Sequence, residues 1–405
     1  DTIMGRYLRA HWIPCMAEHE VPGPDQPPRR LRLLGEDWVV FRDSEGRVGV
    51  LDEHCLHRRA SLFFGRNEEG GLRCVYHGWK FAWDGALLDV PNERRSTGIM
   101  AKLRARACRA QLRGGLLWVY VGPEDAEPAF PEFEWLDLPD THRVVSRWEQ
   151  DCNSVQAMEG ELDPSHASFL HRRLDRLAES DSAIDGRYFQ EDTSPVLHVD
   201  STDYGFITAS QREVDEASAY WRLNQFILPF YTIITTEPDH ARMIRMWVPR
   251  DDESCWVIAL TYRMDEPIRP AEREAWETGV TIHRRIVPGT TRAPENRDND
   301  YLIDREVQST VSFTGIDGIR AQDAMACESA GAIVDRSLEN LVSSDLAIVV
   351  MRKRLLQEAR KMADGGEQPD TAAKGSLYRV RGHQMVLPRE RHYSDDPDAM
   401  RAMYG

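Results

Sequence analysis

The segment Cys74-Val75-Tyr76-His77-Gly78-Trp79-Lys80-Phe81 decides how the first part of this chain folds. It offers one thiolate and one imidazole, and it runs directly into an apolar strand pattern. An earlier run, Cys55-Leu56-His57, is separated from Cys74 by sixteen residues and offers the same two donor types. We predict two loops between strands, each presenting one cysteine and one histidine. Two cysteines on one iron and two histidines on the other are the ligands of one type of [2Fe–2S] cluster.

A structural zinc ion is the alternative for these four side chains, because Cys2His2 sets also bind tetrahedral zinc. Zinc fingers place their histidines on a helix that follows the cysteine pair, whereas each predicted loop here holds one cysteine and one histidine. We therefore expect the cluster. Neutral imidazole in place of thiolate lowers the negative charge of such a cluster and raises its reduction potential. A raised potential suits electron transfer to an oxygen-activating iron.

Short strands and tight turns surround both loops, and they predict a small all-β domain. Asp84-Gly85 is a strong hairpin signal, because an aspartate–glycine pair between apolar runs is typical of a two-residue turn. The predicted strands are Trp38–Phe41, Val48–Leu51, Lys80–Trp83, Ala86–Leu88 and Leu116–Val121. Residues 123–139 are rich in proline and acidic side chains, which indicates a connector. We therefore place the first domain at residues 1–140.

The pattern changes after the connector, and residues 141–405 are predicted to form a second domain. Its strands alternate and are separated by turn residues, which is typical of an antiparallel sheet. The predicted strands are Phe206–Arg212, Tyr220–Ile227, Met243–Val248 and Cys255–Arg263. Helices are predicted over residues 153–177, 271–286 and 337–363. The fold class is therefore α+β, with an antiparallel sheet flanked by helices.

A second group of metal-binding side chains lies at the start of this domain, in Asp163-Pro164-Ser165-His166 and at His171. Histidines five residues apart point about 140° apart around a regular helix, so both can bind one metal only if the helix is broken between them. Two histidines and a carboxylate form the facial triad that holds iron(II) with open positions. The alternative is a capped helix start that carries two ordinary polar histidines.

These two groups resemble the Rieske non-haem iron ring-hydroxylating oxygenases, and the phthalate dioxygenase and phenoxybenzoate dioxygenase branch most of all. The segment from Cys74 to Phe81 follows the family pattern closely, whereas Leu56 and Arg59 replace its usual proline and glycine. The resemblance covers nearly the whole chain. It implies that a Rieske [2Fe–2S] cluster is held by Cys55, His57, Cys74 and His77, and that Fe(II) is bound by His166 and His171.

The resemblance also assigns roles to two carboxylates. The family's third iron ligand is a carboxylate that follows a glutamine or similar residue at the start of a helix, and Asp323 after Gln322 fits this best. The fallback positions are Asp317, Glu328 and Asp335. Asp163 matches the family's bridging carboxylate, which bonds an iron-ligating histidine of its own chain and the Rieske histidine of a neighbouring chain, here His77. Such a carboxylate orients the imidazoles and raises their basicity.

The implied activity is that of an enzyme, the oxygenase component of a multicomponent system. Electrons from NAD(P)H come through a separate flavin/[2Fe–2S] reductase, and O2 is used to hydroxylate a small aromatic substrate. The lack of a Gly-rich dinucleotide fingerprint agrees with the need for a reductase. The branch assembles as homotrimers or stacked trimers. The alternatives are a monooxygenase or O-demethylase on the same ligands and, from another class, a Rieske electron-transfer protein.

The substrate is expected to be an aromatic acid or an aryl ether. An aromatic carboxylate calls for an arginine clamp, and the candidates on predicted strands are Arg212, Arg222, Arg242 and Arg245. The more common outcome for each single arginine is a surface position. The apolar run from Phe226 to Ile234 is expected to be a core strand, with a pocket wall as the alternative.

Composition excludes several other classes. The net charge of −16 argues against nucleic acid and against an anionic membrane as partners. No apolar run approaches the roughly 20 residues that a transmembrane helix needs. Seven cysteines are too few and odd in number for a disulfide framework. We therefore expect a soluble, cytoplasmic protein.

Overall fold

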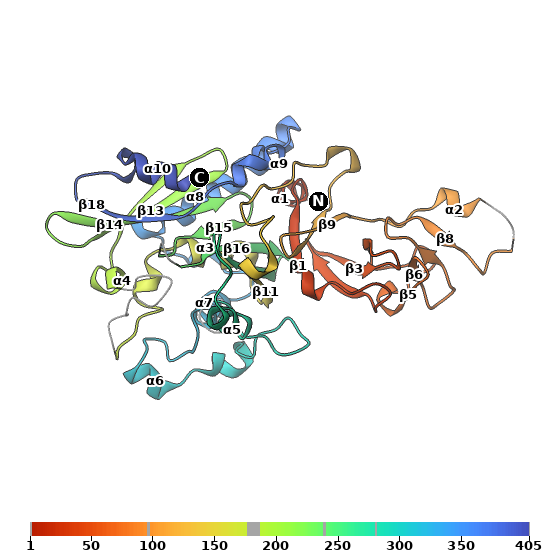
Figure 1. The fold of residues 1–405 in the computed structure, drawn as a ribbon, viewed down its shortest axis with the longest axis horizontal. Helices are drawn as coiled ribbons and strands as arrows, with labels where there is room; N and C mark the ends of the chain where they lie inside the picture. The colour runs from red at the N-terminus through yellow and green to blue at the C-terminus, as the bar shows by residue number, and fades with distance from the viewer. Residues whose placement is uncertain (1, 95–97, 176–186, 238–239, 280–281, 405) are drawn as a thin grey trace. The chain divides into compact units, whose positions relative to one another are not determined.

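The computed structural model describes residues 2–94, 98–175, 187–237, 240–279 and 282–404 (Figure 1). The chain forms two compact units. The first unit comprises Arg9–Pro128 with Pro249–Asp251, and the second unit comprises Asp1–Leu8, Ala129–Val248 and Asp252–Gly405. The domain boundary predicted between residues 140 and 141 remains a prediction.

The first unit consists of small antiparallel sheets, which confirms the predicted all-β fold. Its strands are β1 (Ile13–Ala17), β2 (Arg29–Leu33), β3 (Glu36–Arg42), β4 (Val48–Asp52), β5 (Arg66–Glu68), β6 (Gly71–Arg73), β7 (Lys80–Phe81), β8 (Leu87–Asp89), β9 (Arg109–Arg113) and β10 (Leu116–Tyr120). They pair in the orders β1-β10-β9, β2-β3-β4 and β5-β6-β7-β8. The predicted Asp84-Gly85 turn joins β7 to β8. Gly85 has a φ of +85°, and a Cβ there would meet the carbonyl oxygen of Ala105 at 2.1 Å.

The core of the first unit contains both cysteines that were predicted to bind the cluster. Cys55 and Cys74 are 1% and 2% exposed, and they belong to one hydrophobic group with Phe41, Leu62 and Phe81. The loops that carry them follow β4 and β6. Burial of apolar area stabilises this core at about 25 cal/mol per Å2, so packing of the sheets also fixes where the two sulfurs lie.

The second unit is built on a large antiparallel sheet, as the sequence predicts. Its strands are β11 (Arg143–Gln150), β12 (Val196–Ser201), β13 (Gly205–Glu213), β14 (Ser218–Ile227), β15 (Tyr231–Ile234), β16 (Arg242–Pro249), β17 (Cys255–Tyr262) and β18 (His383–Pro388). Their order is β11-β17-β16-β15-β14-β13-β12, and β18 pairs with β14. The apolar run from Phe226 to Ile234 is core, but it is divided by a turn at Leu228–Phe230 into the ends of two strands.

Helices cover this sheet, which confirms the α+β class. They include α3 (Ser154–Leu162), α5 (Pro270–Glu277), α7 (Ile319–Ser329), α8 (Leu346–Gly365) and α10 (Pro397–Met403). Helix α3 packs against α7, α8 and strand β15. Helices α3 and α7 therefore lie side by side, although they are far apart in the sequence.

Each of the three predicted helices was too long. The one expected from residue 153 ends at Leu162, because Pro164 disfavours helical geometry at Asp163, whose φ and ψ are −86° and 109°. The one expected from residue 271 ends at Glu277, before a glycine at position 279 with positive φ. The one expected from residue 337 begins at Leu346, because the preceding residues form two separate short 3-10 turns.

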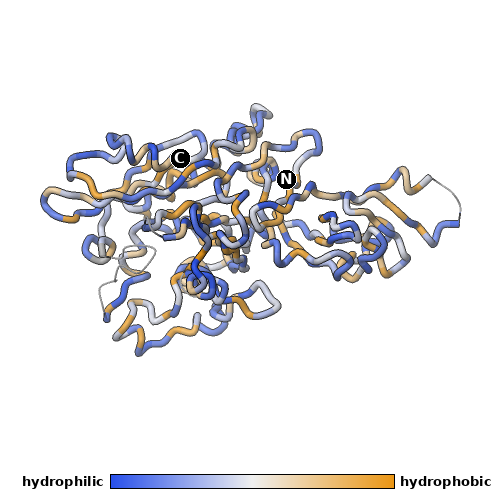
Figure 2. The backbone as a smooth tube through the Cα atoms, in the orientation of Figure 1, coloured by the Kyte–Doolittle hydropathy of each residue, from blue (hydrophilic) through white to orange (hydrophobic). Residues whose placement is uncertain are grey.

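Hydropathy along the chain shows hydrophobic and hydrophilic residues interspersed throughout both units (Figure 2). Across the residues that the structure describes, no helix combines the length and the apolar character that a membrane span requires.

Candidate metal centres

The two predicted cluster loops have closely similar backbone geometry. The backbone N–H of Arg59 donates to the carbonyl of Cys55 over 3.0 Å, and that of Gly78 donates to the carbonyl of Cys74 over 3.0 Å. Each loop therefore closes four residues after its cysteine. This shared turn presents the histidine of each loop, His57 or His77, at the same end of the sheets.

The residues that close these turns have left-handed backbone conformations. Gly78 has a φ of +77°, and a Cβ there would meet Pro91 Cγ at 2.7 Å. Arg59 has a φ of +59°, although it is not a glycine. The departure from the family pattern at this position therefore leaves the loop shape unchanged, at the cost of backbone strain of about 1 kcal/mol.

The two cysteines lie in the core, and the two histidines beside them have the arrangement expected of a ligand set. The rings of His57 and His77 face each other edge to face with centroids 4.4 Å apart. Trp79 stacks on His57 at 4.9 Å, and its indole nitrogen donates to Asn92, which fixes that ring. The His57 Nδ1 atom is buried and has no hydrogen-bond partner. A buried imidazole nitrogen without a partner is costly, so it fits a ligand atom for iron.

The sulfur atoms also fit a cluster. Burial and then the neighbouring Cys74 raise the pKa of Cys55 to about 11, so its thiolate form requires a nearby positive charge such as that of iron. Partial desolvation, then the nearby His57 and Arg58, lower the pKa of His77. A neutral imidazole is the form that binds a metal. Among the described residues, the donor atoms close enough for one single ion belong to a different group, so these four fit a larger, two-iron cluster better than zinc.

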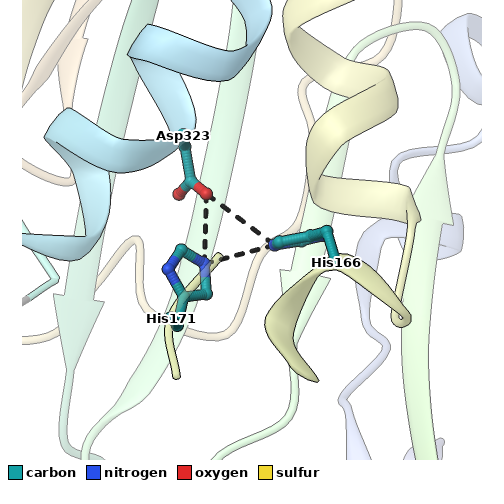
Figure 3. Close-up of side chains that lie close together, drawn as sticks. All are labelled: His166, His171 and Asp323. Carbon is teal, nitrogen blue, oxygen red and sulfur yellow. Dashed lines mark hydrogen bonds and ion pairs between the residues drawn. The ribbon is translucent and has the colours of Figure 1, made fainter. Parts of the chain in front are cut away.

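That different group consists of the three predicted iron ligands, His166, His171 and Asp323 (Figure 3). The two Nε2 atoms lie 3.2 Å apart, and Asp323 Oδ1 lies 3.1 Å from His171 Nε2 and 3.7 Å from His166 Nε2. Ligands at right angles on a metal with bonds of about 2.1 Å are about 3 Å apart. The three atoms thus have the spacing of one face of an octahedron, which suits iron(II).

The backbone explains how histidines five residues apart can meet. His166 begins a 3-10 turn that ends at Ser168, and no helix continues from there to His171. The predicted helix ends at Leu162, before both histidines, so the condition that no regular helix separates them is met. Asp323 comes from the first half of α7, so the group joins two segments more than 150 residues apart.

Neighbouring polar groups orient the triad. Gln322 Oε1 accepts a hydrogen bond from His171 Nδ1 over 2.7 Å, and the Gln322 amide nitrogen donates to the Ile316 carbonyl. This arrangement puts the proton of His171 on Nδ1 and leaves Nε2 free to face the site. Asp163 Oδ2 lies 3.7 Å from His166 Nδ1, which is buried and has no hydrogen-bond partner.

Electrostatics favour a cation at this position. Burial, then the adjacent His171, lower the pKa of His166. Burial alone would lower the pKa of His171 as well, but the Asp323 carboxylate raises it. Burial alone would raise the pKa of Asp323, whereas His171 and Arg320 hold it well below its ordinary value. An ionised carboxylate beside two imidazoles is the donor set that a divalent metal binds.

The fallback carboxylates lie elsewhere. Glu328 accepts a hydrogen bond from Tyr301 over 2.6 Å, Asp317 is 88% exposed at its side chain, and Asp335 caps the 3-10 turn at Arg336–Leu338. The sequence reasoning missed Arg320 and Glu161, which form an ion pair beside Asp323. The three-residue spacing of Arg320 and Asp323 on a helix was the available signal.

Comparisons with known proteins agree with both centres. A family described as "Rieske [2Fe-2S] domain" matches residues 11–105, and one described as "LigXa C-terminal domain like" matches residues 119–399. The chain is 36% identical over 393 residues to the 3-chlorobenzoate-3,4-dioxygenase oxygenase subunit of Comamonas testosteroni. This alignment covers 93% of this chain and 90% of the relative. The chain belongs to the Rieske non-haem iron oxygenases.

Other Rieske oxygenases match over most of their length. The phthalate 4,5-dioxygenase oxygenase subunit of Pseudomonas putida is 33% identical over 98% of this chain and 91% of its own. The 5,5'-dehydrodivanillate O-demethylase oxygenase subunit of Sphingobium sp. (strain NBRC 103272 / SYK-6) is 30% identical. That alignment covers 90% of this chain and 78% of the relative. The solved structure of the Pseudomonas putida CBB5 NdmA QL mutant with caffeine shares the fold, with a TM-score of 0.63, 17% identity, and coverage of 97% of this chain and all of that chain.

Membership of the Rieske oxygenases makes the chain an O2-dependent oxidoreductase that uses a [2Fe–2S] cluster and Fe(II). Two alternatives raised by the sequence are therefore wrong: a structural zinc protein, and a Rieske protein that only transfers electrons. The individual ligand assignments rest on the geometry above.

Proposed function

We propose that this Rieske oxygenase hydroxylates an aromatic carboxylate, and that buried arginines on one face of the large sheet bind the carboxylate group. Three of the four candidate arginines support this. Arg212, Arg222 and Arg245 are 0%, 5% and 0% exposed, so a surface position, the more common outcome for arginine, is wrong for these three. Two relatives are named for a chlorobenzoate and a phthalate, which are both aromatic carboxylates.

The three arginines share a face of the sheet. Arg212 lies opposite Tyr220, two residues before Arg222 on β14, so both point the same way. Phe226 on β14 lies opposite Thr232, and Thr232 lies opposite Arg245, which continues the same face across β15 to β16. The face is the one toward the triad, because Arg212 donates to the carbonyl of Pro164, next to Asp163, over 2.7 Å.

No carboxylate in the described part of the chain lies within ion-pair distance of these three guanidinium groups, although Arg212 and Arg245 are completely buried. The Nε atoms of Arg222 and Arg245 have no hydrogen-bond partner. Burial lowers the pKa of Arg245 to about 9 and that of Arg212 to about 10. The hydrogen bonds that these three arginines donate go to neutral acceptors, mainly backbone carbonyls. A buried cation without a charged partner is costly, so an anionic group of the substrate would stabilise these guanidinium groups. This observation carries the proposal.

The metal ligands complete the site. His166, His171 and Asp323 would hold the ferrous ion, which supplies O2 activation with electrons passed on by the [2Fe–2S] cluster on Cys55, His57, Cys74 and His77. Gln322 keeps the proton of His171 on Nδ1, away from the metal side. The three ligand side chains are 17% to 25% exposed, whereas Arg212 and Arg245 are completely buried, so the attraction between these arginines and a bound carboxylate would be only weakly screened.

Asp163 has a role in electron transfer in this proposal. Ser165 donates to Asp163 Oδ1 from its backbone nitrogen over 2.7 Å and from its hydroxyl over 2.5 Å. The other oxygen, Oδ2, is left on the side of His166 Nδ1. We propose that this carboxylate bonds His166 and the partner subunit's His77, and so shortens the path between a cluster and an iron in neighbouring chains.

A homotrimer or stacked trimer would bring those two centres together. Exposed apolar side chains beside the cluster loop support such an assembly, because Phe64, Val75 and Tyr76 are 64%, 58% and 54% exposed. A second apolar surface lies on the segment before α8, where Leu338 and Val342 are 75% and 66% exposed. The mass in solution, measured by light scattering, tests this: a monomer at micromolar concentration would contradict it.

The remaining partners follow from the need for electrons. The relatives are named as subunits, so a separate NAD(P)H-dependent flavin/[2Fe–2S] reductase is the proposed donor. None of the seven cysteines, all of which belong to the described residues, forms a disulfide, which agrees with the proposed cytoplasmic location.

The test of the substrate class is kinetic. In Arg212→Gln, Arg222→Gln and Arg245→Gln we expect the KM for benzoate-type acids to rise at least tenfold, about 1.4 kcal/mol, because each loses a charged contact. Arg242→Gln is the matched control on the same strand as Arg245, since Arg242 is already paired with Glu134. If Arg212→Gln, Arg222→Gln and Arg245→Gln all keep the KM of the unchanged protein for every aromatic acid tried, the carboxylate proposal is wrong.

O-demethylation is the second candidate, favoured by the relative from Sphingobium. It uses the same ligands and differs in where the oxygen atoms of O2 go. Turnover under 18O2 separates the two: two labelled atoms in the aromatic product indicate dioxygenation, whereas an unlabelled phenol formed together with formaldehyde indicates O-demethylation.

A further inference from the structure

We propose that Arg320, anchored by Glu161, is a positioning residue that fixes which oxygen of Asp323 faces the metal. The inference concerns residues outside the ligand set, and it rests on the metal site of the proposed function. Arg320 Nη1 lies 3.1 Å from Asp323 Oδ2, while Asp323 Oδ1 faces the two imidazole nitrogens. The two oxygens of one carboxylate therefore have different partners.

Glu161 holds Arg320 in place from another helix. Glu161 Oε2 accepts a hydrogen bond from the same Nη1 atom over 2.6 Å. Glu161 lies in the last turn of α3, directly before the segment that carries His166, and Arg320 lies one turn before Asp323 on α7. The ion pair thus connects the two elements whose ends supply the metal ligands.

Burial makes this arrangement strong. The side chains of Arg320 and Glu161 are 8% and 6% exposed, so little water competes for their charges. Arg320 Nε has no hydrogen-bond partner, which leaves Nη1 as the atom that holds both carboxylates. If Asp323 turned Oδ2 toward the metal, the buried guanidinium would lose one of these two contacts. Rotation of the carboxylate is therefore unfavourable, and Oδ1 stays toward the imidazoles.

The consequence for the reaction concerns space at the iron. A carboxylate that binds through one fixed oxygen leaves more of the metal's positions open than one that binds through two. Arg320 would thus protect a position for O2 or substrate without touching either. This role differs from stabilising the fold, because it predicts an effect on the bound metal itself.

The test uses Co2+ as a probe that O2 chemistry does not consume. The full chain, with its cluster oxidised and its mononuclear metal removed by chelation, is titrated with Co2+ by equilibrium dialysis, and the bound Co2+ is examined by EPR. In Arg320→Met we expect Co2+ affinity to fall by about 10- to 100-fold, the usual effect of losing a partner of a metal ligand, and the EPR line shape to change. Unchanged affinity and an unchanged spectrum would overturn the proposal, and so would tighter binding, which would mean that Arg320 acts only by repelling the metal.

Two milder substitutions keep the proposal testable if Arg320→Met does not fold. Arg320→Lys keeps the charge but not the planar fork, and Glu161→Gln removes the anchor, so both should weaken Co2+ binding less than Arg320→Met does. If Arg320→Met does not fold, wild-type binding by these two variants overturns the proposal. Arg336→Met is the matched control, because Arg336 also bridges two carboxylates, Glu159 of α3 and Glu339, and is not a partner of the triad.

The outcome also separates this inference from the metal site on which it rests. If the unchanged protein binds no Co2+, or if His171→Ala binds it equally well, the proposed ligand set is wrong. If the unchanged protein binds Co2+ and His171→Ala does not, while Arg320→Met binds it normally, only the role of Arg320 is wrong.

Discussion

The two metal centres differ in how their ligands are brought together. The cluster ligands lie on two neighbouring loops within 23 residues, from Cys55 to His77, and each loop closes with the same backbone hydrogen bond. The triad combines His166 and His171, which follow α3, with Asp323 on α7. One centre is therefore made by local turns on a small sheet domain, and the other by the packing of distant helices.

This difference shows what each centre depends on. The cluster loops need left-handed turns and a core around their cysteines, and both requirements are met locally by Arg59, Gly78 and the sheets. The triad needs helices that are correctly packed against each other. Polar neighbours such as Gln322 then orient its ligands. We expect the substitution of a metal ligand to impair only the centre that it binds. We expect substitutions of supporting residues to have effects of different size in the two centres.

The largest expected effect comes from the cluster cysteines. Cys55→Ser should abolish the iron–sulfur chromophore and all reductase-dependent turnover, because the cluster loses one of its two thiolates. The mononuclear site should still bind Co2+ with the affinity of the unchanged protein, since its ligands come from the second unit. Visible spectra and metal binding by the same preparation check this, and a joint loss of both centres would show that they are not independent.

His171→Ala is the reciprocal experiment. We expect loss of the mononuclear metal and at least a thousandfold loss of O2-dependent turnover, about 4 kcal/mol, while the cluster is still reduced by the reductase. Turnover and cluster reduction are measured side by side. Normal turnover would contradict the ligand assignment.

A supporting residue of the triad should have a smaller effect. Gln322→Leu removes the acceptor for His171 Nδ1, and we expect metal affinity and turnover to fall by about 10- to 100-fold. Gln322→Glu retains an acceptor and should recover most of the affinity. Equal loss in both variants would mean that Gln322 matters for packing and not for the imidazole.

The smallest expected effect concerns the backbone of the first cluster loop. The free energy of unfolding of Arg59→Gly should exceed that of Arg59→Ala by about 1 kcal/mol. Both variants lack the contact with Asp52, but only alanine is strained by the positive φ at this position. Urea unfolding of the two variants measures the difference. Equal stability would mean that the loop relaxes out of this conformation.

The sequence allowed the first centre to be predicted more completely than the second. The spacing of Cys55, His57, Cys74 and His77 was enough to propose a ligand set, because the loops are local. Several strands of both units were also predicted from alternation and turn residues, whereas others, such as β1, β12 and β18, were not. Helix ends were predicted less well, because Pro164 and the short turns before α8 stop helices that periodicity alone continues.

Asp323 needed the family resemblance, since nothing local links it to histidines more than 150 residues away. The burial of Arg212, Arg222 and Arg245 was not predictable, because a single arginine on a strand is more often exposed. The pair of Arg320 and Glu161 was missed for a related reason: it forms only when α3 and α7 pack together.

Analysis of iron, acid-labile sulfide and zinc in the purified protein, made together with EPR of its reduced form, tests the central claim most directly. Two centres of the proposed kinds predict about three irons and two sulfides per chain and a signal from a histidine-ligated [2Fe–2S] cluster, with about one iron fewer in His171→Ala. Zinc in place of iron with no labile sulfide, or an iron content that His171→Ala does not change, would contradict the account.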